Sequence, residues 1–132
     1  MIDFDSKNWQ IHWPEMSLFK LVGRAIVPVT TFREWVTWHA NTDEWNIGNT
    51  EIGAFIVSTV FLGIERVWGK KPFLFETLVL GNPDSVRWRE RYRNYTDAEN
   101  GHRDVCQWVE NIVRNRNEKP SKLRVGRIPI KQ

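Results

Sequence analysis

The chain has 132 residues, a formal net charge of +3, eight tryptophans and one cysteine. That length fits one domain with a single hydrophobic core, which needs neither disulfides nor metal for stability. The single cysteine, Cys106, excludes an internal disulfide and any metal site built from several cysteines, and it is typical of a reducing compartment. The N-terminal residues lack a signal-peptide pattern and no apolar run is as long as a membrane span, so we expect a cytoplasmic protein without membrane contact.

Charge is unevenly distributed along the sequence. Residues 1–113 contain twelve Lys or Arg and fifteen Asp or Glu, whereas residues 114–132 contain seven Lys or Arg and one acid, Glu118. We therefore expect a single α+β domain over residues 1–114 and a flexible basic tail over residues 115–132. Such a tail can bind nucleic acid, dock on an acidic partner or simply increase solubility, and the sequence leaves these three roles open.

The first predicted elements are a strand and a helix. Residues 18–29 are rich in β-forming side chains and predict one strand, which Pro28 places at a sheet edge or at a strand end. Thr31 and Glu34 then have the spacing of a capping box, in which each side chain bonds a free backbone amide of the other residue. A helix of about ten residues is expected to follow and to end near Asn41.

Three further strands are predicted in the middle of the chain. Residues 44–47 and 52–64 form two of them, with a turn between them at residues 48–50, where Gly and Asn tolerate the positive φ of a hairpin turn. Gly53 is expected at a bulge. Residues 73–80 predict another strand, and we expect it at the centre of a sheet because both of its alternating sets of side chains are largely apolar.

The loop between the last two of these strands, residues 65–72, is long for a hairpin. Trp68, Lys70 and Lys71 lie at its tip and are candidate partner-binding residues. A tryptophan beside lysines can stack on nucleic-acid bases or anchor a protein interface. If any loop of this chain is functional, the sequence favours this one.

Residues 86–93 have the clearest alternation in the chain. Three hydrophobic residues and Glu90 occupy one set of positions, and four arginines occupy the other: Arg87, Arg89, Arg91 and Arg93. Side chains two residues apart on a strand share a face, so the arginines are expected to form a row that suits phosphates or a carboxylate-rich protein surface. The alternative is an edge strand whose charges prevent aggregation, and the sequence leaves both roles open.

A second capping box, Thr96 and Glu99, predicts a helix that runs to about Arg114. The apolar stripe of this helix consists of Ala98, His102, Val105, Val109 and Ile112. His102 is therefore expected to face the core rather than to catalyse, and Cys106 is expected to be an unreactive packing residue. The element order β-α-β-β-β-β-α predicts an α+β fold, with one antiparallel sheet of about four or five strands and both helices packed on one face.

Catalytic signatures are missing from the sequence, which contains no phosphate-binding loop, no nucleophile elbow and no metal-ligand spacing of histidines and carboxylates. The best catalytic constellation would combine Glu65, Glu76 and His102 with Ser58 or Thr59 at one end of a hairpin. For Glu76, the sequence favours a strand residue bonded to Arg66 or to a helix end. We therefore predict no catalytic residues, no cofactor, no metal and no enzymatic activity.

Three segments of the chain resemble a known family: VSTVFLGIERVWG from Val57, PFLFETLVLG from Pro72 and YTDAENGH from Tyr95. They resemble a family of small phage and bacterial proteins of unknown activity, whose usual form is VSTVFLGIDH, a Gly/Pro-rich turn, LLFETMVFGG and a final Y-x-T-W-x-E-A-x-x-G-H segment. The resemblance covers about half of the chain. This sequence departs from the pattern at residues 65–66, where the family has Asp-His, and in the turn, which here contains two lysines.

The predicted function is that of a non-enzymatic phage-type accessory protein, which binds and modulates or inhibits a host protein or nucleoprotein complex. Interference with a bacterial defence system, as an anti-CRISPR protein would achieve it, is the most concrete form of this prediction. Two alternatives stay open, namely a nucleic-acid-binding module that uses the arginine strand and the basic tail, and a small enzyme of unknown chemistry. The chain is expected to be a monomer or a homodimer, and Arg124 and Arg127 complete the candidate partner-binding residues.

Overall fold

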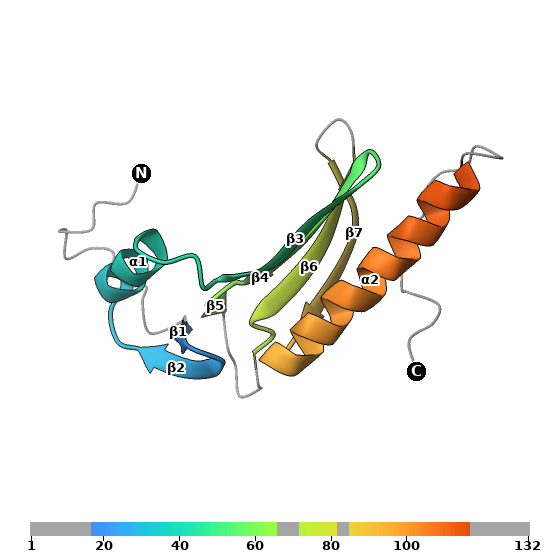
Figure 1. Ribbon diagram of the computed structural model, residues 1–132. Coiled ribbons are helices and arrows are strands. Elements are labelled where there is room, and N and C mark those ends of the chain that lie inside the picture. The colour runs from blue at the N-terminus through green and yellow to red at the C-terminus, as the bar shows by residue number, and fades with distance from the viewer. Residues whose placement is uncertain (1–16, 66–71, 82–84, 117–132) are drawn as a thin grey trace.

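The computed structural model describes residues 17–65, 72–81 and 85–116 (Figure 1). These residues form two helices and two antiparallel sheets, so the predicted α+β class is confirmed. The larger sheet has the strand order β3-β4-β6-β7, and the smaller one has the order β2-β1-β5. Within the described residues, no helix combines the length and the apolar character that a membrane crossing requires.

The chain enters the smaller sheet through a hairpin, β1 (Ser17–Val22) and β2 (Ala25–Val29). A single strand over residues 18–29 was the wrong prediction, because Gly23 adopts a φ of +64° and reverses the chain. A positive φ at only the first of two turn residues is typical of a type II′ turn, and glycine adopts it without steric cost.

Helix α1 (Phe32–Ala40) begins as the sequence predicts. The Thr31 side chain is its N-cap and accepts a hydrogen bond from the backbone N–H of Glu34 at 3.0 Å. Asn41 is the C-cap and donates its own backbone N–H to Trp38 O. The helix packs on β1 and β2 of the smaller sheet, so the prediction that both helices share one face of one sheet is wrong. Its Trp38 reaches Phe61 at the end of β4, with the ring centroids 5.9 Å apart.

The next hairpin consists of β3 (Asn46–Ile52) and β4 (Phe55–Phe61). Its turn lies at residues 53–54, where Gly53 has a φ of +58°, and not at residues 48–50 as predicted. Residues 48–50 lie inside β3, and the bulge falls between Asn46 and Gly48. Alternation of buried side chains along β4 requires this register, since a shift by one residue would turn the buried set outward.

Three more strands complete the sheets: β5 (Ile64–Glu65), β6 (Phe75–Gly81) and β7 (Ser85–Tyr92). The prediction of a single sheet is wrong, because β5 pairs with β1 in the smaller sheet and not with any strand of the four-stranded sheet. Gly63, with a φ of +75°, lies between β4 and β5, and its carbonyl accepts a hydrogen bond from Phe19 N at 2.8 Å. The chain therefore changes sheets at this glycine.

Helix α2 (Tyr95–Arg116) runs along one face of the four-stranded sheet (Figure 1). Its N-cap is Asn94, whose side-chain oxygen accepts from Asp97 N at 2.7 Å, while the Asn94 amide donates to the Asp97 carboxylate at 3.1 Å. The predicted box of Thr96 and Glu99 is therefore wrong by two residues. Those two side chains instead contact Arg24 of the first hairpin, at 3.2 Å and 2.8 Å.

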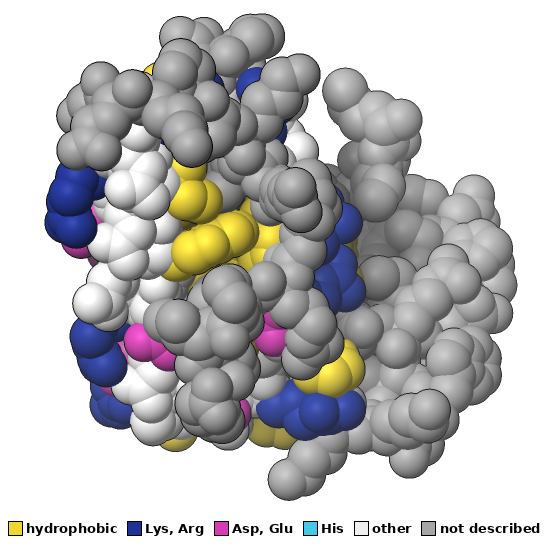
Figure 2. All heavy atoms as spheres, turned by 90° about the vertical axis from the view of Figure 1, so that its right-hand side faces the viewer, with side chains coloured by type: hydrophobic (Ala, Val, Ile, Leu, Met, Phe, Trp, Pro, Cys, Tyr) yellow, Lys and Arg dark blue, Asp and Glu magenta, His cyan; other side chains and the backbone are white. Residues whose placement is uncertain are grey.

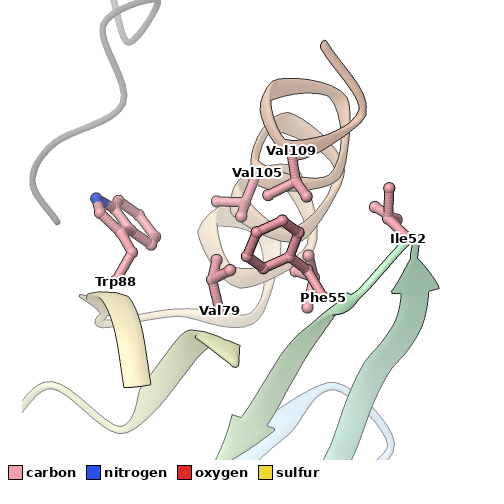
Figure 3. Packing of buried hydrophobic residues seen from close by; sticks show 7 residues of the cluster. Ile52, Phe55, Val79, Trp88, Val105 and Val109 are labelled. Carbon is pink, nitrogen blue, oxygen red and sulfur yellow. The ribbon is translucent and has the colours of Figure 1, made fainter. Parts of the chain in front are cut away.

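The core between α2 and the sheet is divided into two apolar clusters. One contains Val79 and Trp88 of the sheet and Val105 and Val109 of α2, all fully buried, and Figure 3 shows these side chains pointing toward one another. The other surrounds Phe75 and extends to the β1–β2 hairpin and α1. Between the two clusters along β4, β6 and α2 lie Thr59, Thr77 and His102, which form a polar layer.

Candidate functional site

The four-stranded sheet has one face covered by α2 and one face on which no described helix packs. Along β4, alternate residues from Phe55 to Phe61 are buried toward α2, and the residues between them are only partly buried. We call the second face the arginine face. It is formed by Asn49 and Glu51 of β3, Ile56, Ser58 and Val60 of β4, Glu76, Leu78 and Leu80 of β6, and Val86, Arg89 and Arg91 of β7.

The covered face holds His102 in a chain of hydrogen bonds. His102 Nδ1 lies 2.8 Å from Thr59 Oγ1, and His102 Nε2 lies 3.0 Å from Thr50 Oγ1. Thr59 Oγ1 in turn lies 2.6 Å from Thr77 Oγ1. A hydroxyl can donate or accept, so either neutral tautomer of the ring satisfies this chain. Both ring nitrogens are thus engaged by threonines, which fits the predicted structural role of this histidine.

The position of the His102 ring depends on Gly48 of β3. A Cβ atom at residue 48 would come within 2.7 Å of His102 Nε2, which is closer than real side chains approach. Burial lowers the pKa of His102 below its ordinary value of 6.5, because desolvation disfavours the imidazolium. Burial also raises the pKa of the neighbouring Cys106 thiol, so that this cysteine stays protonated and is a packing residue.

The catalytic constellation considered from the sequence is not assembled in the structure. His102 and Thr59 lie on the face covered by α2, whereas Ser58 and Glu76 lie on the arginine face. The backbone of Glu65 belongs to β5 of the other sheet. The sheet itself therefore separates the histidine from the nearest candidate carboxylate.

Glu76 is a nearly buried acid on the arginine face. Its side chain is only 9% exposed and receives Arg91 Nε at 3.0 Å and Arg89 Nε at 3.3 Å. The two arginines flank it because both side chains lie on the same face of β7, and Arg91 is directly opposite Glu76 in the register. Two guanidinium groups on one carboxylate leave this part of the face net positive.

The predicted row of four arginines is interrupted by a bulge. Leu80 pairs with Val86 and Val79 pairs with Trp88, so Arg87 between them has no partner residue in β6. Its side chain lies against Gly81, where an added Cβ would overlap the Arg87 guanidinium. A bulge inserts one residue and shifts the alternation, which strict period-two counting cannot foresee. Arg87 is therefore removed from the row, and Arg89 and Arg91 remain.

Arg93 follows the end of β7 and stacks on Phe73, with its guanidinium carbon 3.8 Å from the ring centroid. Most of the predicted basic tail lies outside the described part of the chain. The remaining candidate partner-binding residues lie outside it as well: Trp68, Lys70, Lys71, Arg124 and Arg127. Helix α2 continues to Arg116, two residues beyond its predicted end.

Two features of the site were not found from the sequence. Gly101 lies in the second turn of α2, and a Cβ there would overlap the Tyr92 ring, so this glycine leaves room for the tyrosine in the core. Burial raises the pKa of that Tyr92 to about 12. The pairing of Glu76 with two arginines could be predicted only once the register of β6 against β7 was known. An acid in an apolar strand did indicate that a cation lies nearby.

Among the described residues, no group of three or more His, Cys, Asp and Glu side chains is arranged to hold a metal ion. No protein-family model, curated protein or solved structure matches this chain. The function must therefore be argued from the two faces of the sheet.

Proposed function

We propose that this protein is a non-enzymatic binding protein whose arginine face docks on an acidic region of a partner protein. The observation that carries this proposal is the pair Arg89 and Arg91, whose side chains are 56% and 43% exposed around the nearly buried Glu76. They lie on a sheet face that no described helix covers. Functional charge on a rigid strand is well placed for recognition, since its geometry is fixed before the partner arrives.

The surroundings of the two arginines favour a protein partner. Val86 is 47% exposed, and Leu78 and Leu80 next to it are partly buried, so apolar and cationic side chains share this surface. On the side of the molecule that Figure 2 shows, Lys and Arg side chains and a few Asp and Glu side chains lie around a hydrophobic area. Protein interfaces combine apolar contact with arginine, which binds carboxylates through two parallel hydrogen bonds. A nucleic-acid surface would instead need an extended basic stripe.

The sheet face under α2 supports a binding role because its polar residues serve the fold. His102 is bonded to threonines at both ring nitrogens, and Cys106 is kept protonated by burial. Modulation or inhibition of a host protein or nucleoprotein complex, including an anti-defence role, is the form of the proposal that the sequence resemblance favours. That form stays a prediction.

Capture from nuclease-treated bacterial extract tests the proposal with three versions of the full chain: wild type, Arg89→Glu and Arg103→Glu. Arg103 is exposed on α2, on the opposite side of the sheet, and gives the same change in charge. Arg89 is chosen for reversal because Arg91, the nearer of the two arginines, then still pairs with Glu76. The melting temperature of each version is measured beside the capture, so that binding is compared only between folded proteins.

We expect wild type and Arg103→Glu to retain the same protein, and Arg89→Glu to lose it. Retention by all three versions would contradict the proposal. Recovery of nucleic acid alone from untreated extract, with a steep decrease at high salt, would favour the nucleic-acid-binding alternative.

A further inference from the structure

A pocket of about 340 Å³ lies between the β1–β2 hairpin and the end of β7. Its volume is within the range of about 300–1,000 Å³ that is usual for sites that bury a ligand group. The lining is mostly apolar and comes from separate parts of the chain: Phe19, Ile26, Pro72, Leu74, Arg93 and Asn94. None of these described residues is acidic.

The pocket is built from residues that other contacts hold in place. Leu74 is 2% exposed and belongs to the second apolar cluster, against which Phe19 and Ile26 of the hairpin also pack. Asn94 is fixed by its capping bonds to Asp97. Arg93 is held at the wall by its stacking on Phe73. The cavity is therefore part of the folded scaffold and does not depend on one mobile side chain.

We propose that this pocket is the anchor site of the arginine face, and that it receives a large apolar side chain from an acidic, extended segment of the partner protein. This inference rests on the proposed function. Arg91 lies on the arginine face, and Arg93, two residues later and just past the end of β7, lines the pocket, so the two features meet at the end of this strand. Alternate residues of an extended peptide repeat every 6–7 Å or so, which matches the spacing of arginines along a strand.

Charge complementarity selects the occupant. Carboxylates of the segment would lie along the arginine row, and an apolar side chain near them would leave water for a pocket lined mainly by Phe19, Ile26 and Leu74. A few well-buried apolar anchors usually supply most of the affinity of such a contact, while the charges set its orientation. A basic segment would be repelled by Arg93 at the pocket wall.

The test uses two fluorescein-labelled probe peptides, each with two glutamates on either side of one central residue, which is phenylalanine in one and alanine in the other. Their binding to the full chain is measured by fluorescence anisotropy. We expect the phenylalanine peptide to bind wild type at least about tenfold more tightly than the alanine peptide, because one aromatic side chain is buried. Ile26→Trp, which fills the pocket, should abolish this preference.

The variant Arg89→Glu separates this inference from the proposed function. It should weaken both peptides by the same factor and leave the preference for phenylalanine intact. If wild type binds both peptides equally and Arg89→Glu weakens both, the arginine face binds acidic segments but the pocket is not an anchor site. If the preference is present but Arg89→Glu changes neither affinity, the pocket stands and the arginine contact is wrong. Absence of binding at millimolar peptide overturns the inference.

A second measurement does not depend on the fold of any variant. A peptide with photoreactive benzoylphenylalanine at its centre is cross-linked to the wild-type chain, and the attachment site is found by mass spectrometry. Attachment at Phe19, Ile26 or Leu74 is expected, and attachment only at residues of α2 overturns the inference. Equally tight binding of 3-phenylpropionate alone would show a small-molecule site and would also overturn it.

Discussion

At the scale of single residues, two glycines decide how the sheet and α2 fit together. Gly48 leaves room for the His102 ring, and Gly101 leaves room for the Tyr92 ring. Neither glycine has a positive φ, so neither is needed for backbone conformation. Each glycine instead lets a neighbouring element pack closely, because a ring occupies the space that a side chain at the glycine would fill.

Gly101→Ala is predicted to destabilise the protein even though alanine is the better helix former. Helix propensity favours alanine by about 1 kcal/mol, whereas forcing an extra methyl group into a packed core costs about 1–3 kcal/mol. Because the new Cβ would overlap the buried Tyr92 ring, we expect the steric cost to exceed the gain. Urea unfolding measures the difference.

Asn100→Ala provides the matched control for that measurement, because residue 100 is exposed one position earlier in the same helix. It should leave the free energy of unfolding within about 0.5 kcal/mol of wild type. A stabilised Gly101→Ala variant would show that Tyr92 can move aside at little cost.

Protonation of His102 is predicted to make stability depend on pH. Its pKa is lowered in the folded protein by burial, so the unfolded chain binds the proton more tightly than the native state does. The stability that the neutral ring contributes is therefore fully present above about pH 6.5, the ordinary pKa of histidine, and is lost as the pH falls toward the folded-state pKa.

Urea midpoints at about pH 7.5 and about pH 5.5 test this dependence in wild type and in His102→Gln. The urea midpoint of wild type should be lower at about pH 5.5 than at about pH 7.5. The decrease should be smaller in the variant, because residue 102 cannot take up a proton there. An equal fall in both proteins would assign the effect to other groups.

At the scale of elements, caps and turns account for most differences between the predicted and the observed structure. Helix α1 was predicted correctly because Glu34 follows Thr31 by three residues, whereas the adjacent Thr30 has Arg33 at that spacing and cannot form a capping box. For α2, Asn94 precedes Thr96 by two residues and caps the helix first. The backbone N–H of Ala98 already bonds to Asn94 O at 3.1 Å, which is the first turn of the helix.

Asn94→Ala should therefore destabilise the protein by about 1 kcal/mol, the usual effect of losing an N-cap. Thr96→Ala should have a much smaller effect, since the Thr96 hydroxyl only accepts an exposed hydrogen bond from Arg24. Thermal unfolding of the two single variants measures both effects. A larger loss of stability in Thr96→Ala than in Asn94→Ala would show that Thr96, and not Asn94, is the N-cap of α2.

The sequence predicted element types better than chain reversals. It identified the strands around Val57 and Val79, the buried stripe of α2 and the structural position of His102. It did not identify the turns at Gly23 and Gly53. The single glycine of the first region was compatible with a bulge as well as a turn, and in the second region Gly48 and Gly53 were both compatible with the turn, so that strand pairing decides. The arginine row was partly predicted, and the bulge at Arg87 depends on pairing with β6.

At the scale of the whole molecule, the two faces of the four-stranded sheet have different roles. One face packs against α2 through two apolar clusters and the His102 layer. The other face presents Arg89 and Arg91 around Glu76. We infer that changes on the first face act mainly on stability, whereas Arg89→Glu on the second face acts mainly on binding.

Arginine modification by phenylglyoxal, read by mass spectrometry, tests this account most directly. The full chain is treated in buffer and in nuclease-treated bacterial extract, and the reactivity of each described arginine is compared. We expect Arg89 to lose reactivity in the extract, while Arg103 and Arg114 on α2 keep theirs. Unchanged reactivity of Arg89, or protection confined to the arginines of α2, would contradict the assignment of the arginine face as the binding surface.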